Sequence, residues 1–151
     1  MIWLRFLHLI GIALWLGAGA VGLLFVTAAK KDTPMRIPRL LLLARIYAAV
    51  LAPGAVLATA TGIALTMTAM SAGFGARLGS PPLAAMQALG VIAGLLEMFV
   101  AFPTAQRLAG FAAAALDGAA WGGERVRARL VGLMSVTLAM VVISTYLGLL
   151  G

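Results

Sequence analysis

Four long apolar runs with short connections between them limit the fold of this chain more than any other feature. The runs cover about 2–29, 40–70, 83–108 and 130–150. A helix needs about 20 residues to cross a bilayer core of roughly 30 Å, and each run is long enough. Because lipid offers no partner to a bare backbone amide, each run is predicted to be helical. We therefore predict one all-α domain over 1–151, a four-transmembrane-helix bundle.

The composition explains why the surrounding solvent should be lipid. The chain is 64% hydrophobic and only 10% charged, whereas soluble domains are typically about 45–50% apolar and about 25% charged. There is no cysteine, which excludes disulfides, iron–sulfur clusters and cysteine-based zinc sites. The first run is longer than the apolar part of a secretory signal, so we expect a retained helix.

The net charge of +7 could indicate nucleic-acid binding, but the positions of the basic residues indicate membrane topology instead. Only Arg5 and Arg77 fall on one side of the predicted bundle. The other nine basic residues fall on the opposite side: Lys30, Lys31, Arg36, Arg39, Arg45, Arg107, Arg125, Arg127 and Arg129. Positive residues favour the cytoplasmic side. We therefore predict an N-out/C-out protein of the bacterial inner (cytoplasmic) membrane, with the lipid bilayer and no nucleic acid as partner.

Small residues at four-residue spacing predict where the helices touch. Gly54, Ala58 and Gly62 form one such face in the second run. Similar pairs occur in the other runs: Ala18 with Gly22, Gly90 with Gly94, and Ser144 with Gly148. Small faces let transmembrane helices approach closely, so we interpret these positions as packing contacts within the bundle.

His8 is the first of three ionisable residues inside an apolar run, and such residues are candidate functional sites. It lies about 9 Å along the first helix, at 1.5 Å per residue. The other helices should bring several polar or sulfur-containing side chains to the same depth: Met67, Met70, Met86, Gln87, Thr145 and Tyr146. Imidazole and thioether groups ligate haem iron or copper(I).

Two ligand sets follow from this grouping. The candidate cofactor-binding residues for haem are His8, Met86, Gln87 and Tyr146, and the candidate copper ligands are His8, Met67 and Met70. Because His8 is the only histidine, a second axial ligand would come from Met86, a second copy of the chain or a partner subunit. In the alternative interpretation, His8 bonds a backbone carbonyl or water, and the methionines fill gaps in the interior.

Glu97 and Arg45 are the other two intramembrane polar residues. A lone carboxylate near the midplane costs several kcal/mol, so Glu97 should be protonated or paired. Arg45 is the only basic residue well inside a run, but its predicted depth differs from that of Glu97 by roughly 7 Å. Either Glu97 handles protons or binds a ligand, or it bonds across helices to Thr59, Thr61 or a partner subunit.

The start of the chain resembles a known group of bacterial membrane proteins. The residues that resemble it are Trp3–Leu9, including Arg5 and His8, then Trp15–Leu16–Gly17, Pro53–Gly54, Thr61–Gly62, Phe102–Pro103 and Gln106–Arg107–Leu108. The group comprises the copper-resistance D family, the HemJ-type membrane protoporphyrinogen oxidases and related uncharacterised four-helix membrane proteins. The resemblance implies a haem-binding role for His8. The oxidases have a lysine early in the third helix, near the position where this chain has Gln87.

Two functions are predicted from these observations. The first is a non-enzymatic accessory or structural subunit of a larger respiratory, photosynthetic or transport complex, or a self-associating bundle, whose partners are other membrane subunits or copies of itself. The second is a haem b- or copper-binding redox or transport protein built on His8. No phosphate-binding loop, metalloprotease helix or nucleophile elbow occurs, so we predict no catalytic residues.

Overall fold

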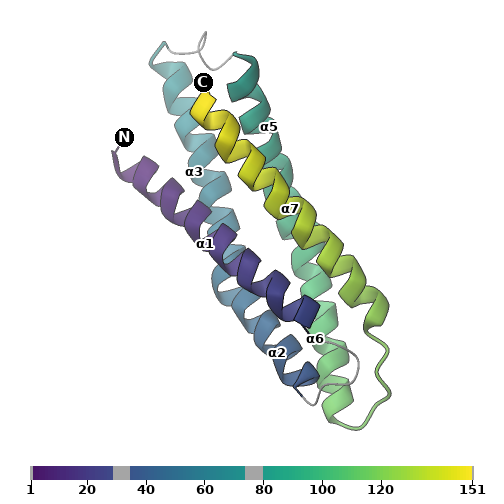
Figure 1. Ribbon diagram of the computed structural model, residues 1–151. Coiled ribbons are helices and arrows are strands. Elements are labelled where there is room, and N and C mark those ends of the chain that lie inside the picture. Colours follow the sequence, from purple (N-terminus) through teal and green to yellow (C-terminus); the bar gives the residue numbers. More distant parts are fainter. Residues whose placement is uncertain (1, 29–34, 74–79, 151) are drawn as a thin grey trace.

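The protein is a bundle of four long helices (Figure 1). The computed structural model describes residues 2–28, 35–73 and 80–150, and within these ranges the chain is all-α. Four spans are long and apolar enough to cross a membrane: Ile2–Ala28, Arg36–Ser71, Pro81–Leu116 and Glu124–Leu149. The predicted fold class is confirmed. The outer spans are single helices, α1 (Ile2–Ala28) and α7 (Glu124–Leu150).

The two middle spans are composite helices, each with a π-helical segment. The second consists of α2 (Arg36–Ile46), η1 (Tyr47–Leu51) and α3 (Ala52–Ser71). The third consists of α5 (Pro81–Leu96), η2 (Glu97–Ala101) and α6 (Phe102–Leu116).

A proline explains each π segment. Pro53 and Pro103 are the second residues after η1 and η2. A proline inside an α-helix lacks the N–H donor and crowds the carbonyl four residues earlier. A π turn widens the helix at that point, and the N–H of Ala52 bonds instead to the carbonyl of Tyr47, five residues earlier. Each proline therefore accompanies a π turn in its helix but does not end the helix.

The helices extend beyond the predicted apolar runs. The second begins at Arg36 instead of 40, the third continues to Leu116, and the fourth begins at Glu124 instead of 130. Basic and alanine-rich residues continue a helix past the hydrocarbon core, whereas hydropathy marks only the core itself. The third helix ends where Gly118 adopts a φ of 92°, a conformation that favours glycine.

Both chain ends lie at the same end of the bundle (Figure 1). We refer to this as the terminal end, and to the other as the arginine end. The described arginines on α2, α6 and α7 other than Arg45 belong to the arginine end: Arg36, Arg39, Arg107, Arg125, Arg127 and Arg129. Lys30, Lys31 and Arg77 lie outside the described residues. The orientation in the membrane stays a prediction from this charge distribution.

Glycine allows α1 and α3 to pack closely. A Cβ atom added at Gly11 would lie 2.5 Å from the backbone nitrogen of Ala58, and one at Gly54 would lie 2.9 Å from the backbone nitrogen of Trp15. A Cβ at Gly62 would lie 3.0 Å from the ring of His8. The packing role predicted for Gly54, Ala58 and Gly62 is confirmed, and this contact sets the position of His8.

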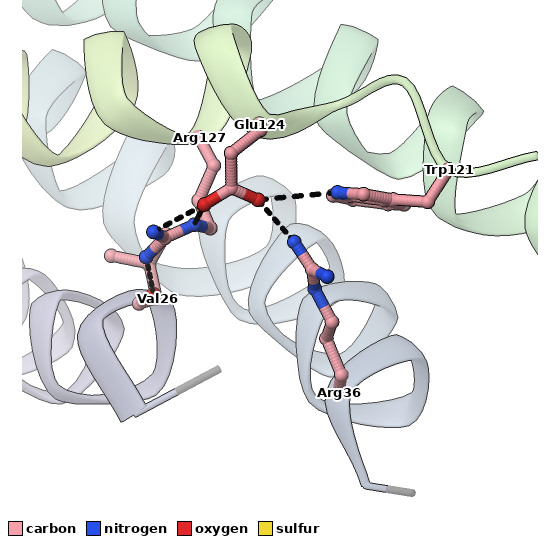
Figure 2. Close-up of polar contacts among 5 residues, drawn as sticks. All are labelled: Val26, Arg36, Trp121, Glu124 and Arg127. Carbon is pink, nitrogen blue, oxygen red and sulfur yellow. Dashed lines mark hydrogen bonds and ion pairs between the residues drawn. The ribbon is translucent and has the colours of Figure 1, made fainter. Parts of the chain in front are cut away.

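A cluster of polar side chains connects the helices at the arginine end of the bundle (Figure 2). The Glu124 carboxylate forms ion pairs with Arg36 and, at 2.6 Å, with Arg127, and it accepts a hydrogen bond of 3.2 Å from the Trp121 indole. Arg127 also donates to the carbonyl of Val26 at 3.0 Å. The guanidinium of Arg36 lies 4.3 Å from the centre of the Trp121 ring. These contacts join the end of α1, the start of α2 and the start of α7.

Candidate functional site: a cavity at the terminal end and the polar centre below it

A partly open cavity of about 700 Å³ lies among α1, α3, α5 and α7. On α1 its wall is formed by Arg5, His8, Ile12 and Trp15, which follow one another on successive turns. Trp15 is only 3% exposed, whereas Arg5 is exposed. The cavity therefore runs from a mouth at Arg5, near the chain termini, to a floor at Trp15 in the middle of the bundle.

His8 is held by α3 and contributes to the cavity wall. Its Nδ1 lies 2.8 Å from the carbonyl oxygen of Ala58 and 3.1 Å from the hydroxyl of Thr61. Because a carbonyl can only accept, Nδ1 is assigned as the protonated nitrogen that donates to Ala58. In the described part of the chain, Nε2 has no hydrogen-bond partner. In this tautomer, Nε2 has a free lone pair.

The other predicted ligands divide into two groups. Met67, Met86 and Gln87 line the cavity together with His8. Met70 and Tyr146 do not line it, and they are 61% and 60% exposed. Among the described residues, no group of three or more histidine, cysteine or acidic side chains is arranged to hold a metal ion.

Glu97 lies at the centre of the bundle, below the cavity. Its side chain is 1% exposed, and its carboxylate accepts a hydrogen bond from the phenol of Tyr47. The side chains of Trp15 and Thr137 lie beside it, and the Thr137 hydroxyl donates to the carbonyl of Met134 at 3.3 Å. We call Trp15, Tyr47, Glu97 and Thr137 the polar centre. It takes one residue from each of the four spans, and Tyr47 and Glu97 begin the two π segments.

The partners expected for Glu97 from the sequence lie elsewhere. Thr61 donates to the carbonyl of Leu57, and the hydroxyl of Thr59 has no partner among the described residues. Both threonines are on α3, and the Thr59 side chain packs against Gly94 of α5, about one turn before Glu97. Arg45 is exposed on the surface of α2, and no ion pair joins it to Glu97 in the described part of the chain.

The cavity and the polar centre share Trp15. Sequence reasoning missed Trp15, Tyr47 and Thr137 as members of this cluster, because an aromatic residue or a threonine in an apolar run does not stand out. Pro53 and Pro103 each lie six residues after a member of the cluster, Tyr47 and Glu97. The prolines therefore mark the two π segments in the sequence, but they do not predict which side chains meet.

The four spans and the buried polar centre mark this chain as a multi-pass membrane protein with a cavity at one end. No protein-family model matches the chain, and neither the curated proteins nor the solved structures include a match. The resemblance to the copper-resistance D and HemJ-type group therefore stays a prediction.

Proposed function

We propose that this chain is a membrane protein that binds haem b in the terminal-end cavity, where Nε2 of His8 would bind the iron. The observation that supports this most directly is that His8 lines the cavity while its Nε2 has no hydrogen-bond partner among the described residues. Nδ1 lies 2.8 Å from the carbonyl of Ala58, a bond that the alternative interpretation of His8 as a structural residue also predicts. A ligating histidine typically donates its other ring N–H to a carbonyl or carboxylate, which fixes the ring and the tautomer. Here that bond fixes the ring of His8 in a cavity wall.

The other cavity residues fit a haem group. Met86 contributes a thioether to the lining, and His/Met pairs are one of the axial sets that proteins use for haem. Ile12, Trp15 and Val141 give the cavity apolar walls. Bound haem would supply one-electron chemistry, whereas the chain would fix the imidazole and exclude water. Each predicted set has one residue outside the lining, Met70 in the copper set and Tyr146 in the haem set. The volume of about 700 Å³ favours haem, because it suits an organic group and not a single ion.

A visible absorption spectrum tests this proposal. The full chain, purified with added haemin and freed of excess, should show a Soret band that is lost in His8→Ala. Added imidazole should restore the band in His8→Ala by entering the space left by the ring. Tyr146→Phe, outside the cavity, should keep the wild-type spectrum. A wild-type protein that stays colourless would refute haem binding, and bound copper without a Soret band would favour the metal alternative.

A second candidate function is that of an accessory or structural subunit in a bacterial inner-membrane complex. Its support is a shallow groove on the outside of the bundle, lined by Ala48, Ala52, Pro53, Val56, Leu57, Ala60 and Phe102. Phe99, on the neighbouring helix, is 73% exposed. Small residues allow a further transmembrane helix to approach closely.

Energy transfer between labelled copies in liposomes tests this second function. Ala52→Leu would fill the groove and should reduce association of the chain with itself, whereas Ala20→Leu on the exposed face of α1 should not. If the labelled copies never associate, self-association is ruled out. Co-purification from the native membrane then tests other subunits as partners.

A further inference from the structure

The polar groups of the cavity are unevenly distributed from mouth to floor. Arg5 at the mouth and Trp15 at the floor are ten residues apart on α1, which is about 15 Å at 1.5 Å per residue. Arg5 is the only charged side chain in the lining, since no carboxylate is among the described lining residues. The mouth is therefore positive, while the lower walls are mainly apolar.

Most hydroxyl groups in the lining already have partners in the protein. Thr66 donates to the carbonyl of Gly62, Ser144 to that of Met86, and Thr145 to that of Val141. These three groups have no donor left for a ligand.

Three other polar groups of the lining have no such partner. In the described part of the chain, the Thr59 hydroxyl is buried without a hydrogen-bond partner. Arg5 forms no ion pair with a described residue, and the side-chain amide of Gln87 forms no hydrogen bond within the same ranges. A buried polar group without a partner costs about 1–3 kcal/mol. The cavity thus offers unused donors near the mouth and in the wall of α3.

We infer that Arg5 makes the cavity selective for acidic amphiphiles, with the acid group at the mouth and the apolar body between α1, α3, α5 and α7. Guanidinium is well suited to this role because it stays charged and binds carboxylate or phosphate through two parallel hydrogen bonds. This inference rests on the proposed function, because it requires that the cavity holds a ligand. A free acid and an anionic membrane lipid share this chemistry, so the test includes both.

Fluorescence of Trp15 at the floor provides the measurement. The chain has three tryptophans, so Trp3→Phe with Trp121→Phe leaves Trp15 as the only reporter. The probes are dibromostearic acid, its methyl ester and a brominated phosphatidylglycerol, because bromine quenches tryptophan only at short range. The full chain is used in a neutral detergent.

The expected result depends on the charge at position 5. The acid should quench Trp15, and Arg5→Gln should weaken acid binding about tenfold, equivalent to about 1.4 kcal/mol, while leaving the ester unchanged. Arg5→Lys should retain much of the preference. Arg129→Gln, a matched loss of an exposed arginine at the other end of the bundle, should change neither probe. The same Arg5 dependence with brominated phosphatidylglycerol alone would identify a lipid as the source of the acid.

Three failures can be distinguished. If acid and ester quench Trp15 equally and Arg5→Gln changes neither, the cavity binds ligands but the selectivity inferred for Arg5 is wrong. If haemin gives a Soret band but no probe quenches Trp15, the inference about acidic amphiphiles alone fails. If haemin gives no Soret band, the proposed function itself fails, whatever the probes show.

Discussion

The phenol of Tyr47 donates a hydrogen bond to the carboxylate of Glu97 where the two π segments of the bundle meet. The two residues are buried, at 0% and 1% exposure. A carboxylate in a transmembrane span is expensive unless other groups satisfy it. Tyr47 satisfies it here with a neutral donor from the second span, and the polar side chains of Trp15 and Thr137 lie beside it on two other helices. The hydrogen bond joins the two middle spans at the centre of the bundle.

Tyr47→Phe should destabilise the protein. It removes a buried donor and leaves part of the Glu97 carboxylate unsatisfied, which costs about 1–3 kcal/mol. The chain has two tyrosines, and Tyr146 is 60% exposed, so Tyr146→Phe is the matched control. Unfolding in mixed micelles measures the difference. Equal stability of the two variants would contradict a structural role for the Tyr47 bond.

Glu97→Gln should be better tolerated than Glu97→Leu. The glutamine side-chain carbonyl can still accept the hydrogen bond from Tyr47. Leucine would leave the buried Tyr47 phenol without an acceptor. Stability in micelles should follow the order Glu, Gln, Leu. A leucine variant as stable as the wild type would show that the carboxylate does not hold the helices together.

Gly11→Val should separate α1 from α3 and disturb His8. A Cβ at Gly11 would meet the backbone of Ala58, and overpacking of this kind costs about 1–3 kcal/mol. Gly17 on the same helix has no atom within 4 Å of an added Cβ, so Gly17→Val is the control. The variants are compared by thermal stability and by haem binding. If haem binding were lost only in Gly17→Val, the packing described for α1 would be wrong.

Glu124→Gln should loosen the arginine end. It removes the ion pairs to Arg36 and Arg127. Since Glu124 is partly exposed, at 43% of its side chain, each pair contributes at most about 1 kcal/mol. The loss should shrink at high salt, because salt screens exposed charges. Asp117→Asn, at an exposed position near the end of α6, should have little effect. A salt-independent loss would argue against an electrostatic role.

The predicted orientation can be tested with single cysteines, because the chain has none of its own. Ser71→Cys lies at the terminal end and Asp117→Cys at the arginine end, and both positions are exposed. In intact cells, a membrane-impermeant maleimide should label Ser71→Cys and should reach Asp117→Cys only after permeabilisation. The reverse pattern would mean that the arginine end faces outward.

The number of helices and the separation of charge between the two ends followed from the sequence alone. Hydropathy and charge are sums over a run, so they do not depend on which side chains meet. The helix faces that pack closely could also be predicted, because close approach of two helices requires glycine or alanine at regular spacing. His8 could be identified as a candidate site residue because ionisable side chains are rare in transmembrane spans and are usually functional there.

Only the tertiary structure decided which polar groups meet. Glu97 accepts a hydrogen bond from Tyr47 instead of Thr59, because Tyr47 and Glu97 face one another across the bundle, whereas the Thr59 side chain packs against Gly94, about one turn before Glu97. Likewise, Met86 and Gln87 line the cavity and Tyr146 does not, although all three lie at similar depth. The depth of a side chain in the membrane follows from its position along the helix. The direction in which it points depends on how the helix is rotated about its axis, and helix packing and the π segments at Pro53 and Pro103 determine that rotation.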